Sequence, residues 1–113
     1  ECYAQVVERA GCWFMLDINN IYVSSQNHRF LPNEYLARID FSRVLQAHVA
    51  GHTREPNGTI IDTHDQPVAE AVWQLYAQAY RAQPFPTLLE WDEHIPPLAE
   101  ALADLNGAKQ ERA

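Results

Sequence analysis

The sequence predicts an α/β fold, namely the C-terminal portion of a TIM (β/α)8 barrel with about three parallel strands and their helices. Three short apolar runs alternate with helical patterns along the 113 residues, which is typical of parallel βαβ units with right-handed crossovers. A complete barrel takes ~250 residues, so a chain of this length holds only part of one. We therefore expect part of a barrel domain over residues 1–106 and a solvated tail over residues 107–113.

The chain is expected to open with the end of a helix. Apolar side chains recur at helical spacing within residues 1–10, and Gly11 follows where a C-terminal cap belongs. The apolar run over residues 12–16 shows no alternation, which predicts a strand covered on both faces. After Asp17 the composition turns polar, and we expect a loop up to about Pro32.

The middle of the chain is expected to hold a short helix, a second strand and a hairpin. Asn33 could cap a helix over residues 34–39. The apolar run over residues 44–50 predicts the second strand. The dipeptide Asn57-Gly58 is a strong tight-turn signal and predicts a small hairpin.

The last part of the chain is expected to hold two helices around a third strand. Pro67 suits the first position of a helix, whose apolar stripe stops before Pro84. Residues 87–89 are the third strand candidate. Pro97 opens the last helix, which we expect to end at Gly107.

Charge and cysteine content exclude several classes of protein. The chain has 8 basic and 15 acidic residues and no basic cluster, so we expect no nucleic-acid binding. No apolar run approaches the ~20 residues that span a bilayer, so we expect no membrane segment. The two cysteines, Cys2 and Cys12, are too few for a disulfide framework, which favours reduced thiols in a cytoplasmic protein.

Side chains that bind metals follow the strand candidates. Asp17, His48 and Glu90 stand at or near the carboxyl ends of the three runs, where α/β barrels carry their active sites. Between the second and third runs, Asp62 and His64 would point the same way in an extended segment. We therefore expect all five side chains to converge on one metal site. Imidazole and carboxylate ligands without thiolate suit iron, manganese or catalytic zinc.

Other polar residues near these strands add to the candidate site. Four of them could orient the metal ligands or contact the substrate: Asn19, Asn20, His52 and Asp92. Each candidate ligand also has a plainer interpretation. Asp17 could cap a loop, His48 could be a hydrogen-bonded core residue, and Asp62 and His64 could belong to a polar hairpin arm. The joint pattern at successive strand ends favours the metal site over these separate interpretations.

Four motifs carry a resemblance to a known family: LDINNIYVSSQNH, LQAHVAGHT, IIDTHDQPV and TLLEWDEHIPPL. In these motifs the chain resembles the multinuclear non-haem iron-dependent oxidases, the domain of unknown function 692 family, which includes the methanobactin biosynthesis oxidase subunit. The resemblance covers residues 11 to about 103. It implies a xylose-isomerase-like TIM barrel that holds two or three iron ions at the carboxyl ends of its strands.

The resemblance also implies a reaction and its partners. Such enzymes use dioxygen to oxidise cysteine or neighbouring atoms in ribosomally made precursor peptides, which a partner protein often presents. Carried over onto the motifs, the implied iron ligands are the five residues of the candidate site, namely Asp17, His48, Asp62, His64 and Glu90. Asn20 is a further residue that the motifs could carry over.

The family pattern contains two further histidines and a glutamate from the first half of the barrel, which these 113 residues lack. The chain alone is therefore expected to be an incomplete, inactive part of the enzyme that associates with itself, with no metal or another divalent metal bound. Two other functions stay open at this point. One is a divalent-metal TIM-barrel hydrolase or isomerase that uses zinc or manganese. The other is a non-catalytic barrel fragment that acts as a folding or interaction module.

Overall fold

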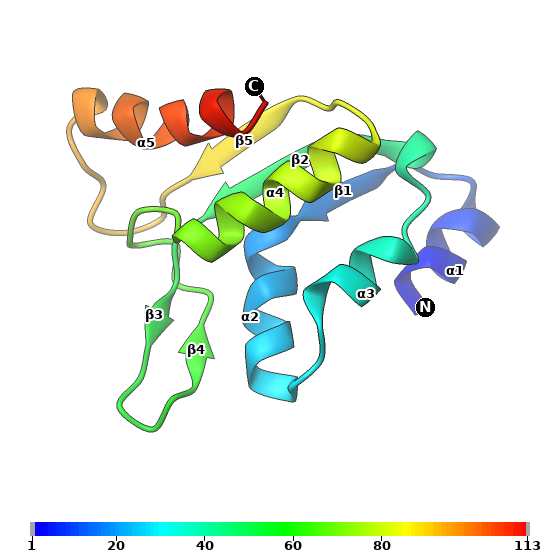
Figure 1. The fold of residues 1–113 in the computed structure, drawn as a ribbon, viewed down its shortest axis with the longest axis horizontal. Helices are drawn as coiled ribbons and strands as arrows, with labels where there is room; N and C mark the ends of the chain where they lie inside the picture. The colour runs from blue at the N-terminus through cyan, green and yellow to red at the C-terminus, as the bar shows by residue number, and fades with distance from the viewer. Residues whose placement is uncertain (1, 113) are drawn as a thin grey trace.

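The structure, a computed structural model, describes residues 2–112 as helices on one side of a small parallel sheet (Figure 1). The helices are α1 (Cys2–Ala10), α2 (Ile18–His28), α3 (Pro32–Ala37), α4 (Glu70–Ala82) and α5 (Leu98–Arg112), with a 3-10 turn at Phe41–Arg43. The strands are β1 (Phe14–Asp17), β2 (Val44–Ala50), β3 (Thr53–Arg54), β4 (Ile60–Ile61) and β5 (Thr87–Glu90). Strands and helices alternate along most of the chain, as predicted.

The main sheet has the order β1-β2-β5, and both strand pairs are parallel. The prediction of an α/β fold with three parallel strands is confirmed, and the arrangement is compatible with part of a barrel. The register aligns Asp17 with His48 and Ala50 with Glu90. The carboxyl ends of all three strands therefore meet at one edge of the sheet, which sets the position of the candidate site.

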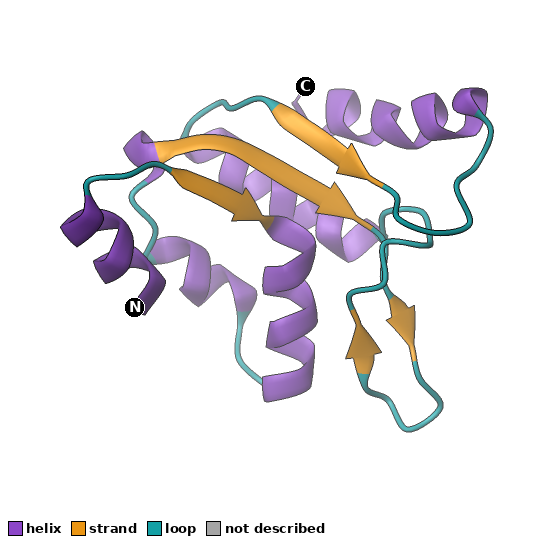
Figure 2. Ribbon diagram, turned by 180° about the vertical axis from the view of Figure 1, so that it is seen from behind, coloured by secondary structure: helices purple, strands orange, loops and turns teal. Residues whose placement is uncertain are grey.

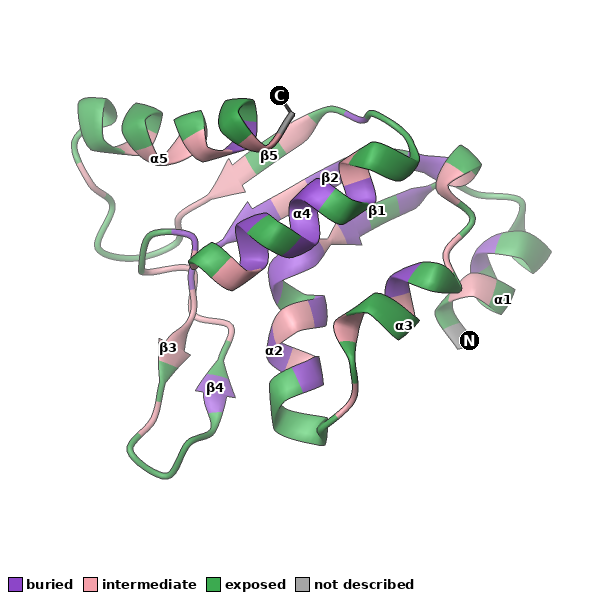
Figure 3. Ribbon diagram, in the orientation of Figure 1, coloured by how far each residue is buried: buried purple, intermediate pink, exposed green. Residues whose placement is uncertain are grey.

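Helices cover only one face of this sheet. Figure 2 shows the three strands with no helix in front of them, while α4 lies behind. On the covered side the core is closely packed, with Val49, Val72 and Tyr76 completely buried (Figure 3). On the other side Met15 and Leu88 are 43% and 49% exposed. The prediction that the apolar strands are covered on both faces is wrong for the described residues, because nothing in residues 2–112 packs on the second face.

Helix α2 replaces the loop that was predicted after Asp17. Its composition is poor in helix formers, because isoleucine, valine, serine and asparagine all have low helix propensity. Tertiary contacts outweigh that preference, since Ile18, Ile21 and Ser25 are buried against the rest of the chain. The Asp17 carboxylate caps the helix by accepting a hydrogen bond of 3.0 Å from the Asn20 backbone N–H. Packing and a side-chain cap thus produce a helix that local propensity does not predict.

The hairpin predicted around Asn57-Gly58 is confirmed. Strands β3 and β4 pair antiparallel, and Gly58 has a φ of +91°, a left-handed conformation that glycine adopts without strain. The predicted cap of the short helix is wrong. Helix α3 begins at Pro32, after Leu31 in an extended conformation, so Asn33 lies within the first turn. Proline at the first helical position has no N–H that would need a partner.

Helix α5 does not end at Gly107 but continues to Arg112, so the residues after it do not form the predicted solvated tail. The reason is close packing between α4 and α5. A Cβ atom at Gly107 would lie 2.5 Å from Cε2 and 2.7 Å from Nε1 of Trp73, so only glycine allows this approach. Ala108 is buried in the same interface. The glycine therefore serves helix packing and is not a C-terminal cap.

Asp104 on α5 makes the α4–α5 interface sensitive to pH. Its carboxylate accepts a hydrogen bond of 3.3 Å from the Val68 N–H, and burial raises its pKa above 3.8 despite that bond. The folded chain therefore holds this proton more tightly than the unfolded chain, and the associated stability is lost as pH rises above 3.8. We expect Asp104→Asn, which keeps an acceptor but cannot ionise, to be more stable than the wild type at neutral pH.

Urea unfolding at neutral pH and at about pH 3.5 checks this expectation, since the difference between the two proteins should shrink at the lower pH. A difference that stays constant or grows on acidification would contradict the assignment to Asp104.

Cys12 is a free, exposed cysteine, whereas the side chain of Cys2 lies outside the described part, so the predicted state of that thiol stays a prediction. Among the helices in residues 2–112, none combines the length and the apolar character that crossing a membrane requires.

Candidate metal centre

The ends of the three parallel strands deliver the first half of the candidate site. Asp17 ends β1, Glu90 ends β5, and His48 lies beside Asp17 in the register of β2. The Nδ1 atom of His48 lies 2.7 Å from Oε1 of Glu90. Both side chains are largely shielded, with 12% and 24% of their surface exposed. A parallel sheet brings these residues together because its carboxyl ends share one edge.

The segment after the hairpin delivers the second half of the candidate site. His64 lies with Nε2 2.7 Å from Oδ1 of Asp62 and Nδ1 3.8 Å from Oε2 of Glu90. The expected extended geometry is wrong, because His64 has a φ of +55° in the left-handed region. Two backbone hydrogen bonds hold this conformation, from the His64 N–H to the Gly51 carbonyl and from the Asp92 N–H to the His64 carbonyl. A turn, not strand alternation, therefore brings Asp62 and His64 together.

Two asparagines at the start of α2 hold the Asp62 carboxylate. Asn19, which is completely buried, donates from Nδ2 to Asp62 Oδ1 and to the Gly51 carbonyl, and Asn20 donates to Asp62 Oδ2 over 3.3 Å. The Asn19 Oδ1 atom lies 2.9 Å from Nδ1 of His52. Because an amide oxygen can only accept, His52 must be the donor in that contact. Each of the three residues thus contributes to holding Asp62, directly or through Asn19.

Asp92 fixes the orientation of His64. Its Oδ2 atom lies 2.9 Å from Nδ1 of His64, so a carboxylate faces each ring nitrogen, Asp92 at Nδ1 and Asp62 at Nε2. A carboxylate that orients a histidine in this way is the usual partner of a metal-binding imidazole.

Two buried histidine nitrogens have no hydrogen-bond partner in the described structure, Nε2 of His48 and Nε2 of His64. Nε2 of His64 does lie 2.7 Å from the Asp62 carboxylate, an ion-pair contact when the ring is protonated. Buried polar atoms rarely stay unpaired, so such atoms call for another partner. In addition, single donor atoms of Asp17, His64 and Glu90 all lie within 4.8 Å of one another. This donor set fits a divalent cation such as iron, manganese or zinc.

Negative charge concentrates around these donors. Burial raises the pKa of Asp17 against the hydrogen bond from Asn20, and the charges of Asp62 and Glu90 raise it further. Burial by itself lowers the pKa of His64, but Asp62, Asp92 and Glu90 outweigh it and the pKa rises. Both shifts have the same physical origin, a group of carboxylates in a partly desolvated place. A bound cation would neutralise this charge.

Comparison with known proteins decides the family. Residues 1–112 match the family described as RiPP precursor modification enzyme MbnB/TglH/ChrH, where RiPP denotes a ribosomally synthesised and post-translationally modified peptide. The chain belongs to the MbnB/TglH/ChrH family. Its predicted resemblance is thereby confirmed, since that family is the one that the four sequence motifs indicate.

Individual relatives carry only a family-level name. The chain is 51% identical over 107 residues to a UPF0276 protein of Caulobacter vibrioides and 43% identical over 114 residues to one of Anaeromyxobacter. A third relative, from Bordetella pertussis, is 47% identical over 105 residues. These alignments cover 94%, 100% and 88% of this chain. They cover only 38%, 40% and 36% of the relatives, so the chain spans about two fifths of their length.

All nine residues predicted for the site of this MbnB/TglH/ChrH family member lie in one connected group at the sheet edge. Their roles as metal ligands and as supporting residues stay predictions. The sequence did not indicate three further participants. The Gly51 carbonyl anchors both Asn19 and His64, Asn27 contacts the backbone of Ile60, and Trp91 has a buried indole nitrogen without a partner. Only Trp91 had a sequence signal, its position next to Glu90.

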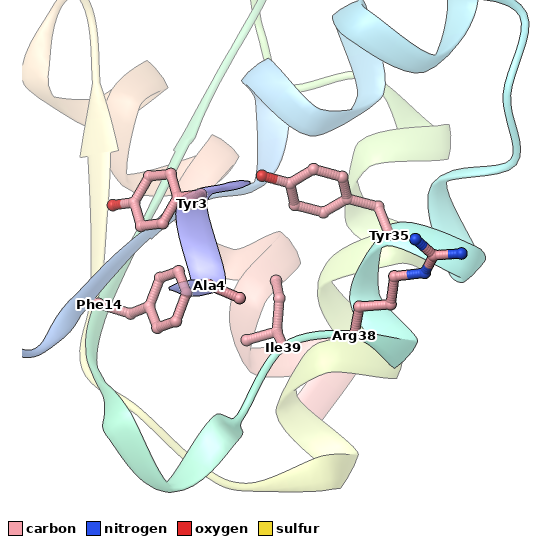
Figure 4. A pocket seen from close by; sticks show the side chains of 6 residues that line it. All are labelled: Tyr3, Ala4, Phe14, Tyr35, Arg38 and Ile39. Atoms are coloured by element: carbon pink, nitrogen blue, oxygen red, sulfur yellow. The ribbon is translucent and has the colours of Figure 1, made fainter. Parts of the chain in front are cut away.

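One small hollow in the described part of the molecule lies away from the candidate site. Figure 4 shows it between α1, β1 and α3, lined by apolar and aromatic side chains together with Arg38. Its volume is about 20 Å³, which is room for about one water molecule. None of the nine predicted residues lines it, so it offers no substrate site for this family member.

Proposed function

We propose that this chain forms part of a multinuclear non-haem iron oxidase that uses dioxygen to modify cysteine-containing ribosomal precursor peptides. One observation carries the proposal: two buried histidine nitrogens without a hydrogen-bond partner lie among carboxylates at the carboxyl edge of a parallel sheet. The family supplies the substrate class, because its members modify peptide precursors. The donor set supports the metal, because imidazole and carboxylate are the ligands that iron takes in such enzymes.

The residues that would hold iron are Asp17, His48, Asp62, His64 and Glu90. When bound there, iron supplies the redox chemistry with dioxygen that none of these side chains can perform. The carboxylates would balance the charge of the cations, and Glu90 is placed to serve more than one ion, because its two oxygens face His48 and His64 separately. Asp92 contacts Nδ1 of His64 and so orients the ring, which leaves Nε2 as the nitrogen that would bind a metal after losing its proton.

We further propose that the complete protein is a xylose-isomerase-like TIM barrel. The chain covers about two fifths of its relatives, and its sheet has one open face, which would be the barrel interior. The remaining strands would then contribute the two histidines and the glutamate that the family pattern adds to the site. The precursor peptide would reach the metal ions at the carboxyl edge of the sheet, presented by a partner protein.

Iron analysis of the full-length protein, purified without oxygen, tests this function. We expect two or three iron ions per protein, a Mössbauer spectrum of high-spin non-haem iron, and oxygen consumption that depends on the precursor peptide. Zinc or manganese in place of iron, with turnover that proceeds without oxygen, would support the hydrolase or isomerase instead. A protein with none of these metals would overturn the metal site altogether.

The open sheet face gives a prediction for the isolated 113-residue chain. Within residues 2–112, β1 and β5 are edge strands that each pair with β2 alone, and Met15 on β1 and Leu88 on β5 are exposed. Such edges and apolar faces favour association. We expect the isolated chain to form dimers or larger species at micromolar concentration in sedimentation experiments. A cooperatively folded monomer of 12.9 kDa would show that these elements are self-sufficient.

A further inference from the structure

Asn27 makes an unusual contact with the hairpin. Its side-chain amide donates from Nδ2 to the Ile60 carbonyl over 2.8 Å, and its Oδ1 accepts from the Ile60 N–H over 2.9 Å. The two residues are 33 positions apart in the chain, and Ile60 is only 1% exposed. One side chain therefore satisfies both polar backbone groups of a buried residue.

The Asn27 side chain makes the two backbone hydrogen bonds that a neighbouring strand would make to Ile60. Ile60 is opposite Arg54 in the β3–β4 pair, and the hydrogen bond of Glu55 goes to Thr59, so the backbone of Ile60 faces away from β3. A hairpin whose strands have two residues each is not stable by itself. Without Asn27, the N–H and C=O of Ile60 would both lose their hydrogen-bond partner, which is unfavourable for the backbone of a buried residue.

The same helix holds the metal-ligand segment at two places. Asn19 and Asn20, at the first turn of α2, bind the Asp62 carboxylate, and Asn27, near the last turn, binds Ile60. Asn20 and Asn27 are seven residues apart, which is about two helical turns, so they lie on one side of α2. Residues 60–62 contact this side of the helix. The backbone leading into Asp62 is thus held against α2, whereas His64 itself is held by the Gly51 and Asp92 backbone just beyond β2 and β5.

We propose that Asn27 is a positioning residue for the metal centre. It acts through Ile60 and sets where the segment with Asp62 and His64 meets the strand-end ligands His48 and Glu90. The proposal rests on the proposed metal-binding function. It goes beyond that function because it assigns the position of two candidate ligands to a residue whose side chain is hydrogen-bonded to Ile60 and not to a ligand.

The first experiment measures the metal-free full-length protein by hydrogen exchange. The variants are Asn27→Ala and Asn27→Asp, with Gln26→Ala as the matched control, since Gln26 is an exposed neighbour on the same helix. We expect Asn27→Ala to speed exchange in residues 60–64 at least tenfold and to leave β2 and β5 unchanged. Asn27→Asp keeps the acceptor for the Ile60 N–H but loses the donor, so it should have an intermediate effect. It also serves as the test variant if Asn27→Ala fails to fold.

The second experiment titrates the same proteins with Co²⁺ alone and records the visible absorption spectrum. We expect Asn27→Ala to bind Co²⁺ about tenfold more weakly and with a changed spectrum, because a displaced Asp62–His64 segment alters the ligand geometry. Gln26→Ala should match the wild type in both. Purely structural weakening would lower the melting temperature but leave the spectrum of the bound Co²⁺ unchanged.

The two experiments separate the two proposals. A wild-type protein that binds no Co²⁺ refutes the metal function, and the exchange data then decide alone whether Asn27 fixes the segment. A wild type that binds Co²⁺, together with an Asn27→Ala variant of equal affinity and spectrum, overturns the positioning role and leaves the metal function intact. Unchanged exchange in residues 60–64 overturns it as well.

Discussion

Replacing His48 or Asp62 by alanine in the full-length protein is expected to lower bound iron and peptide-oxidising activity together. His48 has a buried Nε2 without a hydrogen-bond partner, and Asp62 lies 2.7 Å from Nε2 of His64. Removing a supporting residue from a metal site typically costs 10–100-fold in metal affinity, at roughly 1.4 kcal/mol per tenfold, so losing a ligand should cost about 100-fold or more. Metal content and turnover on the same samples provide the measurement.

His28→Ala is the matched control for this prediction, because His28 is an exposed histidine on α2. It should keep the iron content and the activity of the wild type. Melting curves of the metal-free variants show whether the fold survives, which separates a lost ligand from a lost structure. Wild-type iron content in both His48→Ala and Asp62→Ala would reject these residues as ligands.

Among alanine substitutions of the four glycines, Gly51→Ala is expected to cause the largest loss of folding stability. Gly51 is buried, and a Cβ atom there would overlap the carbonyl group of Gln66 and lie 2.8 Å from the Pro67 carbonyl oxygen. These are backbone atoms, which cannot rotate away as a flexible side chain can. Overpacking typically costs about 1–3 kcal/mol and occasionally more, and we expect a loss of about 3 kcal/mol or more here. Urea unfolding of the full-length protein measures this loss.

Metal binding at the candidate site should also weaken in Gly51→Ala. The Gly51 carbonyl accepts hydrogen bonds from Asn19 and from the His64 N–H, so moving this backbone displaces a supporting residue and a candidate ligand together. Gly58→Ala is the control, because no atom lies within 4 Å of a Cβ there. Its left-handed φ should cost only about 1–2 kcal/mol and leave metal binding intact. A Gly51→Ala protein as stable as Gly58→Ala would contradict the prediction, because it would show that the backbone around Gln66 can move to make room for the methyl group.

Much of the fold could be predicted because apolar periodicity reports burial directly. The runs at β1, β2 and β5 are apolar, and one face of these strands packs under helices. Asn57-Gly58 marks the hairpin because few residues suit that turn. The errors have a common origin. Helix α2 forms against its local propensities, and α5 passes through Gly107, because packing against distant residues outweighs what a short stretch of sequence prefers.

The sequence by itself determined the kinds of donor and their places in the chain: carboxylate and imidazole groups at successive strand ends, in motifs specific enough to identify the family. Only the tertiary structure decided how they meet. Three features of the site rest on hydrogen bonds between residues at least 13 positions apart. They are the left-handed turn at His64, the contacts of the buried Asn19 side chain, and the contact of Asn27 with Ile60. Hydrogen bonds of this kind form only once the sheet and α2 have brought their partners together, so no local sequence pattern predicts them.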